Sequence, residues 1–151
     1  MLGELIIYSV KENLEELMSN HNLTLTQLSA ELGIPYKTIS NYTNGKYLPN
    51  LNTAIKIANY FHCSINYLVG LSDSEEYGNY SEVDNLFLSR YEELLKTTKV
   101  THYRVTKDLG LNINISRKWR AGTTPSLAVL TKLANYFGVT IDYLIGRNNL
   151  G

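Results

Sequence analysis

Three histidines, His21, His62 and His102, and the single cysteine, Cys63, are the side chains best suited to metal or covalent chemistry. A structural zinc site needs four such ligands, and a catalytic nucleophile needs a base positioned beside it. His62 and Cys63 are adjacent, but no residue near them completes a set of four ligands. No Ser/His/Asp arrangement, phosphate-binding glycine loop or pair of carboxylates stands out. The sequence therefore predicts a protein that is not an enzyme and that has no metal and no cofactor.

A run of cations, Arg117, Lys118 and Arg120 around Trp119, is the stronger signal of binding chemistry. Grouped Lys and Arg side chains neutralise the phosphates of nucleic acids. The same run is also compatible with a solvated helix face around a buried tryptophan. Its role therefore depends on the elements that surround it.

Charge is unevenly distributed along the chain, although the formal net charge is zero. Residues 1–76 hold four Lys/Arg and eight Asp/Glu, which gives −4, and residues 77–151 hold ten and six, which gives +4. A single cysteine excludes a disulfide within the chain, and the longest apolar run is too short to cross a membrane. The N-terminus has no signal-peptide pattern. We therefore expect a cytoplasmic protein whose two halves differ electrostatically.

The elements that position these side chains occur twice. Residues 57–70 read IANYFHCSINYLVG and residues 133–146 read LANYFGVTIDYLIG, so eight of fourteen residues are identical. Matches continue towards the N-terminus, where Gly33 meets Gly110 at an offset of 77 residues. Two copies at this long period indicate a duplicated domain and not a solenoid.

The extent of the repeat defines the expected domains. Copy one covers roughly residues 9–70 and copy two roughly residues 86–146, and the polar, acidic sequence between them is typical of a linker. We expect an N-terminal domain at 1–71, a linker at 72–84 and a C-terminal domain, the diverged duplicate, at 85–151.

Each copy is expected to contain five α-helices. Apolar residues spaced at i, i+4, i+7 and i+8 predict a first helix that contains Val10, Leu14, Leu17 and Met18. The same spacing recurs in copy two, and Asn50, Ser64 and Thr140 are suited to cap later helices. The segment ELIIYSV, at residues 4–10, is the only candidate for a strand.

Two short helices and the turn between them indicate what the protein binds. Thr24 and Gln27 form a capping-box pattern, and Gly33 is suited to end that helix. Pro35 suits the first turn of the next helix, and Gly45 ends it. A tight turn sets two such helices at a steep angle. The second helix then exposes a polar face, and a helix presented in this way can enter the major groove of DNA.

The pattern T-x-x-x-L-S-A-E-L-G-I-P-x-x-T-I-S-N-Y-x-N-G-K-x-x-P in copy one resembles the phage repressor/Cro helix-turn-helix family, also called the XRE family. The following AIKIANYFHCSINYLVGLSD is similar to helices four and five of that family. Copy two resembles it through VTKDLG, SRKWRAGTTPS and LTKLANYFGVTIDYLIG. The resemblance implies an all-α protein with two tandem five-helix lambda-repressor-like helix-turn-helix domains joined by a short acidic linker.

The resemblance also implies DNA-binding residues. In copy one, the groove-facing positions are Tyr36, Lys37, Thr38 and Asn41, of which Asn41 suits adenine and Lys37 suits guanine. The positions that meet the DNA backbone are Asn44, Gly45 and Lys46. In copy two the matching positions are Ile113, Asn114, Ile115 and Lys118, with Arg117 and Arg120 beside them.

Copy two departs from the family pattern in the middle. Ser116 stands where copy one has the buried Ile39. Either this helix is shifted so that Ile115 packs inward, or its DNA-facing surface is altered. Leu25 and His102 occupy the place where the family often has a glutamine that touches phosphate.

The function implied by the resemblance is that of a sequence-specific DNA-binding transcriptional regulator, a repressor of phage or mobile-element type. Recognition helices at 36–44 and 113–121 would enter the major groove of double-stranded DNA. The charges suggest that copy one discriminates bases while copy two mainly attracts the backbone. The chain would act as a covalent pseudo-dimer or form a homodimer through exposed apolar groups near residues 5–10.

The alternative is a protein-interaction module that keeps the fold and has weakened DNA reading, such as an antirepressor, an antitoxin or a phage-encoded inhibitor. Zero net charge and the altered middle of copy two favour this alternative, whereas the recognition helix of copy one favours the regulator. A protein antirepressor or inducer is a further partner that we expect for a regulator with no visible ligand-sensing domain.

Overall fold

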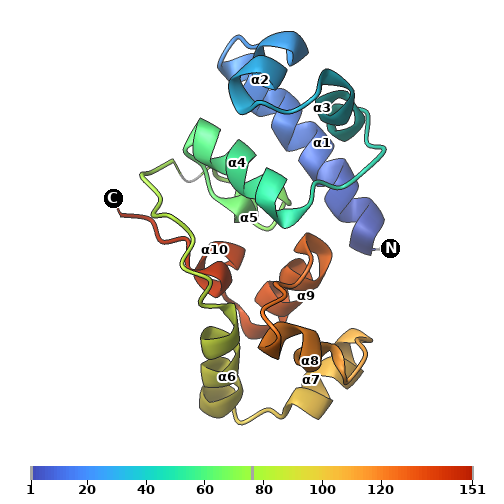
Figure 1. The fold of residues 1–151 in the computed structure, drawn as a ribbon, viewed down its shortest axis with the longest axis vertical. Coiled ribbons are helices and arrows are strands. Elements are labelled where there is room, and N and C mark those ends of the chain that lie inside the picture. The colour runs from blue at the N-terminus through green and yellow to red at the C-terminus, as the bar shows by residue number, and fades with distance from the viewer. Residues whose placement is uncertain (1, 76, 151) are drawn as a thin grey trace. The chain divides into compact units, whose positions relative to one another are not determined.

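The structure is a computed structural model that describes residues 2–75 and 77–150 (Figure 1). The described residues form ten α-helices and no β-strand, which confirms the prediction of an all-α protein. The candidate strand at 4–10 was wrong, because these residues lie within the first helix, α1 (Leu2–Asn20). Ile6, Val10 and Leu14 recur at intervals of four residues and are buried, so helical periodicity outweighs the β-propensity of the segment.

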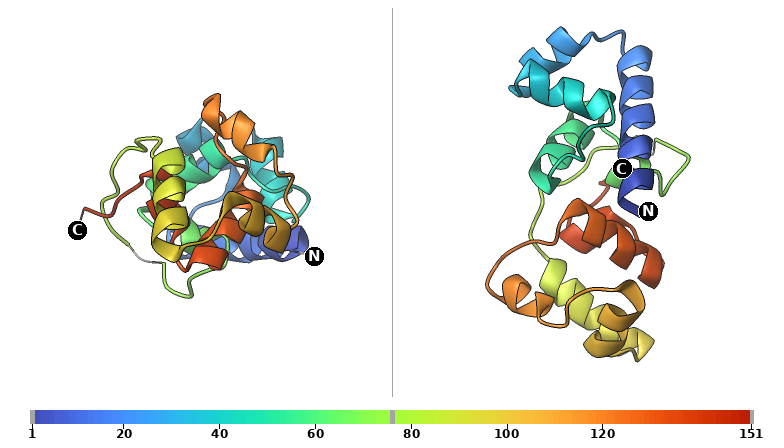
Figure 2. Two further views of the ribbon diagram at one scale, coloured as in Figure 1. Left: turned by 90° about the horizontal axis from the view of Figure 1, so that it is seen from below. Right: turned by 90° about the vertical axis from the view of Figure 1, so that its right-hand side faces the viewer.

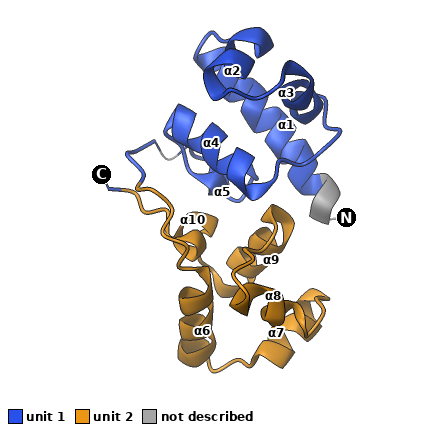
Figure 3. Ribbon diagram, viewed as in Figure 1, with its two compact units in different colours: residues 1–80, 150–151 blue, residues 81–149 orange. Residues whose placement is uncertain are grey.

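The chain divides into two compact units (Figure 3). Unit 1 comprises residues 1–80 with 150–151, and unit 2 comprises residues 81–149. The helices of unit 1 after α1 are α2 (Leu25–Leu32), α3 (Tyr36–Thr43), α4 (Leu51–Phe61) and α5 (Ile65–Leu68). The helices of unit 2 are α6 (Phe87–Thr98), α7 (His102–Leu109), α8 (Ile115–Arg120), α9 (Leu127–Phe137) and α10 (Ile141–Ile145).

The segment expected to be a linker is hydrogen-bonded to the units. The backbone N–H of Ser64 donates to the carbonyl of Glu75 at 3.2 Å, and that of Gly78 donates to the carbonyl of His62 at 2.9 Å. Within unit 2, the N–H of Ser81 donates to the carbonyl of Asn148 at 2.8 Å. Residues 72–80 thus belong to unit 1, and the residues that follow belong to unit 2.

Side-chain caps set the helix boundaries at the positions that the sequence predicts. The hydroxyl of Thr24 accepts from the N–H of Gln27 at 3.2 Å, while the amide oxygen of Gln27 accepts from the N–H of Thr24 at 2.9 Å, so the capping box is complete. Asn50, Ser64 and Thr140 each accept a hydrogen bond from the backbone N–H three residues later. Each cap satisfies a donor that the helix itself leaves unpaired.

The two units have different cores. In unit 1, α1 is one uninterrupted helix that packs against α3 and α5 (Figure 2). Its buried side chains include the aliphatic residues Leu14 and Leu17. In unit 2, aromatic rings pack together in the core: the ring of Trp119 lies 4.9 Å from that of Phe87 and 5.2 Å from that of Tyr91. Edge-to-face contacts of this kind add to the stabilisation gained from area burial alone.

The burial pattern of α8 decides which residue of this helix faces the core. Ser116 is 8% exposed and occupies the inward position, while Ile115 is only half-buried. The shift that would turn Ile115 inward therefore does not occur, and α8 keeps the same inward register as α3. At three matching core positions, unit 2 has Phe87, Tyr91 and Trp119 where unit 1 has Val10, Leu14 and Tyr42. Unit 2 therefore has larger side chains at these core positions and a smaller one at Ser116, and cores tolerate such exchanges when total volume is maintained.

Candidate nucleic-acid interface

A three-residue connection redirects the chain between α2 and α3 of unit 1. Gly33 has φ +65°, a conformation that side-chain-bearing residues adopt only at a cost. The N–H of Ile34 donates to the carbonyl of Ser29 at 3.1 Å, and the hydroxyl of Ser29 donates back to the carbonyl of Ile34 at 2.5 Å. Pro35 then precedes α3 with φ −54°, a value ready for the start of a helix. These contacts fix the direction in which α3 leaves the turn.

The α3 helix has one face in the core and one face in solvent. Ile39, Tyr42 and Thr43 are buried at helical spacing. On the opposite side, Tyr36 is 51% exposed and Lys37 is also exposed. Thr38 and Asn41 are half-buried, so their polar groups lie at the edge of the exposed face. The structure thus brings the four predicted groove-facing residues together on the accessible side of one short helix.

The turn after α3 presents polar groups next to this face. The N–H of Lys46 donates to the carbonyl of Asn41 at 2.9 Å, and Gly45 has φ +69°. The side-chain amide of Asn44 donates to the hydroxyl of Ser40 at 3.2 Å. Asn44 and Lys46 are both exposed. Among the described residues, neither Lys37 nor Lys46 forms an ion pair with a carboxylate, so both charges are available to a polyanion.

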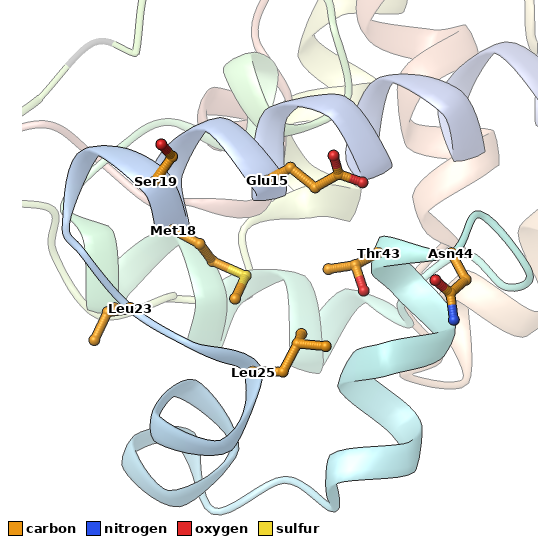
Figure 4. A pocket seen from close by; sticks show the side chains of 7 residues that line it. All are labelled: Glu15, Met18, Ser19, Leu23, Leu25, Thr43 and Asn44. Atoms are coloured by element: carbon orange, nitrogen blue, oxygen red, sulfur yellow. The ribbon is translucent and has the colours of Figure 1, made fainter.

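A pocket of about 360 Å³ lies between α1, α2 and the C-terminal end of α3. Its lining combines apolar and polar side chains: Glu15, Met18, Ser19, Leu23, Leu25, Thr43 and Asn44. Figure 4 shows Leu25 and Thr43 facing the same space, while Met18 reaches it from α1. Leu25 has no hydrogen-bonding group, so the side chain at this place in unit 1 cannot donate to a phosphate.

The α8 helix of unit 2 is shorter than the sequence suggested. It begins at Ile115, two residues after the predicted start at 113, and ends at Arg120. The side-chain oxygen of Asn112 accepts from the N–H of Asn114 at 2.8 Å, and its carbonyl accepts from the N–H of Ile115 at 3.0 Å. Asparagine commonly stabilises turns in this way, at the expense of helix. Asn114 therefore precedes the helix, and Ile113 lies in the turn with 47% of its surface exposed.

The cationic run lies on the accessible face of α8. Arg117, Lys118 and Arg120 are exposed, while Trp119 between them is 4% exposed and belongs to the core, as the sequence predicts. Within the described part of the chain, none of the three cations pairs with a carboxylate. By contrast, Arg104 on α7 pairs with Asp108 at 3.2 Å. The three unpaired cations of α8 thus place exposed positive charge on the helix that follows the connection between α7 and α8.

A hydrogen-bonded relay that was not predicted from the sequence fixes the turn before α8. The hydroxyl of Tyr91 lies 2.7 Å from Nδ1 of His102, and Nε2 of His102 lies 2.9 Å from the carbonyl oxygen of Ile113. Burial raises the pKa of Tyr91 to about 12, so its hydroxyl is protonated at neutral pH and can donate to Nδ1. Nε2–H then donates to Ile113. The sequence repeat contained a sign of this relay, because Tyr91 and His102 of copy two match the apolar residues Leu14 and Leu25 of copy one.

The described histidines and the cysteine do not form a metal-binding cluster. Cys63 is buried, and Nδ1 of His21 lies 2.8 Å from the carbonyl oxygen of Leu17. In the parts of the chain that the structure describes, no three His, Cys, Asp or Glu side chains are grouped to hold a metal ion. No helix there is both long and apolar enough to span a membrane.

Comparisons with known proteins identify similar chains. The family model for helix-turn-helix domains matches residues 14–68, which lie in unit 1. An uncharacterized HTH-type transcriptional regulator from Methanocaldococcus jannaschii is 36% identical over 66 residues, which is 44% of this chain and all of that protein. Another from Rickettsia prowazekii is 33% identical over 64 residues, 40% of this chain and 70% of the relative. The crystal structure of a transcriptional regulator from Listeria innocua shares 27% identity and covers 76% of this chain and 96% of its own, with a TM-score of 0.39.

The chain therefore belongs to the helix-turn-helix family of transcriptional regulators, which is not a family of enzymes.

Proposed function

We propose that this protein is a sequence-specific transcriptional regulator that binds double-stranded DNA through both units, with α3 and α8 each entering a major groove. The observation that carries the proposal is the division of α3 into a buried face and an exposed polar face behind a rigid turn. Unit 2 supports it with a second pair of short helices, α7 and α8, and with three unpaired cations on α8. On this proposal, unit 2 is a second, diverged helix-turn-helix domain.

The proposal assigns base reading chiefly to unit 1. The side-chain amide of Asn41 donates to N7 of adenine and accepts from its N6 amino group, and Lys37 donates to guanine in the major groove. Tyr36 and Thr38 lie beside them on the same face and complete the contact. Asn44 and Lys46 hold the DNA backbone from the turn that follows α3, because both are exposed and next to that face.

Unit 2 adds affinity with less discrimination. Arg117, Lys118 and Arg120 neutralise phosphates, and Asn114 lies in the turn beside them. Each phosphate neutralised releases counterions, which makes the binding constant depend on salt. Because the two units share one chain, binding of the first raises the effective concentration of the second. The chain then recognises an asymmetric site as a covalent pseudo-dimer, or a longer site as a homodimer.

Repression follows if the site overlaps a promoter, since a protein bound in the major groove excludes the transcription machinery. We assign the protein to the class of phage or mobile-element repressors that act in the cytoplasm, where a partner protein such as an antirepressor relieves repression. Exposed Leu5 and Tyr8 on α1, at 66% and 62% exposure, offer an apolar contact for a second copy or for such a partner.

Selection of binding sites from a random duplex library with the full-length protein tests the proposal. We expect an enriched motif with two unlike halves, and loss of sequence preference in one half for Asn41→Ala. Lys118→Ala is the matched variant in unit 2, and it is expected to weaken binding across sequences. Absence of enrichment, together with absence of duplex binding at low salt, would refute the proposal.

A second candidate is a protein-interaction module of the antirepressor, antitoxin or inhibitor type. Leu5 and Tyr8 favour it, because exposed apolar groups next to each other on a helix often mark contacts between proteins. The same binding experiment separates the two functions, since a pure interaction module has no salt-dependent affinity for duplex DNA.

A further inference from the structure

We propose that Ile113 is a specificity-determining residue of unit 2 that recognises the 5-methyl group of thymine, and that His102 is the positioning residue that holds it for this contact. The inference rests on the proposed function and adds to it a base-reading contact in the unit otherwise assigned to backbone attraction. It is drawn from three features of the turn before α8: an exposed apolar side chain, a fixed backbone, and cations beside it.

Ile113 is an unusual side chain for its surroundings. It is 47% exposed, and its neighbours Asn112 and Asn114 are exposed and polar. Arg117 and Lys118 on the following helix are exposed cations. In the free protein, the 47% of its surface that faces water gains nothing from burial. It gains free energy when a partner covers it, and the cations identify that partner as a polyanion.

The backbone of Ile113 is held from two sides. Nε2 of His102 donates to its carbonyl oxygen at 2.9 Å, and His102 is in turn held by the Tyr91 hydroxyl at 2.7 Å. On the other side, the Asn112 side chain accepts from the N–H of Asn114 at 2.8 Å. The side chain of isoleucine is itself stiff, because branching at Cβ restricts its first torsion. Little conformational entropy is therefore lost when this group makes a contact.

The chemistry of the major groove selects the target. Every base edge presents hydrogen-bond donors or acceptors there, and the methyl group of thymine is the largest apolar group on the unmodified bases. Isoleucine offers no donor or acceptor, so covering a polar base edge with it leaves that edge without water and without a partner. Contact with thymine avoids this cost and buries two apolar groups against each other.

The hydrogen bonds that hold this turn occur only in unit 2 among the described residues. Tyr91 and His102 correspond to Leu14 and Leu25 of unit 1. Neither leucine has a side-chain group that can hydrogen-bond to the turn before α3. Leu25 instead lines the pocket between α1, α2 and α3. Tyr36, at the position that matches Ile113, combines an exposed ring with a hydroxyl group and is suited to mixed contacts.

The test compares thymine with uracil, which lacks the methyl group and is otherwise the same base. Duplexes enriched by selection are synthesised with thymidine, and then with deoxyuridine at one position at a time. We expect one position in the half contacted by unit 2 where deoxyuridine weakens binding of the wild-type protein about fourfold, the effect of one buried methyl group. Ile113→Ala should abolish the difference at that position, and Ile113→Val should keep most of it. Leu150→Ala, which shortens an apolar side chain that is 70% exposed, is the matched control and should leave the difference intact.

The positioning role has its own readout. His102→Leu, which introduces the residue of unit 1, should reduce the thymine preference at that position and leave the salt dependence of binding unchanged. His102→Gln keeps a donor towards the Ile113 carbonyl and should restore much of the preference, and Tyr91→Phe is a milder variant that removes only the hydroxyl. The fluorescence of Trp119, the single tryptophan, reports whether unit 2 of each variant is folded.

The outcomes distinguish this inference from the proposed function. Salt-dependent, sequence-specific binding without any thymine preference in unit 2 overturns the inference and leaves the regulator intact. A preference that persists in Ile113→Ala overturns it as well. If no duplex is bound at low salt, both fail together.

Discussion

Replacing Ile39 by serine, the residue that unit 2 carries at the matching position, should destabilise unit 1 strongly. Ile39 is 0% exposed and lies on the inner face of α3, beneath the proposed DNA-binding surface. Ser116 is the inward residue at the matching position of unit 2, where the first helix contributes the buried rings of Phe87 and Tyr91, whereas the first helix of unit 1 contributes aliphatic residues such as Leu14. The substitution therefore removes volume that nothing nearby replaces.

The magnitude follows from the atoms removed. Ile39→Ser removes three carbon atoms from a fully buried site, and at about 0.8 kcal/mol for each buried methylene this costs about 2.4 kcal/mol. A residual cavity adds to this loss, and measured Ile→Ala costs range from about 2 to 5 kcal/mol. The new hydroxyl can donate to the carbonyl of Pro35, one helical turn earlier, so it adds little. We therefore expect a loss of about 3 kcal/mol.

Urea unfolding followed by far-UV circular dichroism measures this change. Trp119 fluorescence, recorded in the same titration, follows unit 2 alone and shows whether the loss is confined to unit 1. Lys37→Ala on the same helix is the matched control, since Lys37 is exposed and forms no ion pair with a described residue, so its replacement should change the free energy of unfolding by less than about 0.5 kcal/mol. A loss below about 1 kcal/mol for Ile39→Ser would refute the argument that the two cores differ in their need for volume at this position.

Three further predictions concern DNA binding and pH. Asn41→Ala should lower the preference for the correct base at one base pair by roughly 5- to 150-fold, as competition binding with single-base variants of the duplex would measure. The salt dependence of affinity should stay unchanged, because the asparagine amide carries no charge. Replacing Arg117, Lys118 and Arg120 together by glutamine should reduce the slope of log affinity against log salt by about 0.9 for each phosphate that is no longer neutralised, and an unchanged slope would remove these cations from the interface. Burial raises the pKa of Tyr91 to about 12 in the folded protein, above the value of about 10 in the unfolded protein. The stability that the neutral hydroxyl contributes is therefore complete below about pH 10 and is lost as the pH rises towards 12. Urea midpoints at increasing alkaline pH should therefore fall less steeply for Tyr91→Phe than for the wild type.

Local chemistry made much of the fold predictable from the sequence. The capping box of Thr24 and Gln27 and the left-handed glycine at Gly33 depend only on residues within one or two turns of each other. The inward and outward faces of α3 follow from the spacing of Ile39 and Tyr42. For the same reason, the polar face of α3 could be anticipated.

Features that depend on interactions between distant residues were not predictable in this way. The His102 relay joins α6, α7 and the turn before α8, and no local pattern indicates it. The late start of α8 depends on the side chain of Asn112, which competes with the helix for backbone donors. The segment ELIIYSV has strand-forming residues, but Ile6 and Val10 become buried only as part of a long helix.

At two matching positions of the internal sequence repeat, the units differ in residues that contact each other in unit 2. Leu14 and Leu25 of unit 1 correspond to Tyr91 and His102 of unit 2, whose side chains are hydrogen-bonded to each other. Either change alone would place one polar group where its partner is still aliphatic, and an unpaired, partly buried polar group costs more than the hydrogen bond contributes. Such pairs show coupling energies of about 0.5 to 3 kcal/mol in double-mutant cycles. On the proposal that unit 2 is a diverged duplicate, the two polar residues were acquired together or through a tolerated intermediate. Their hydrogen bonds hold the turn that presents Ile113.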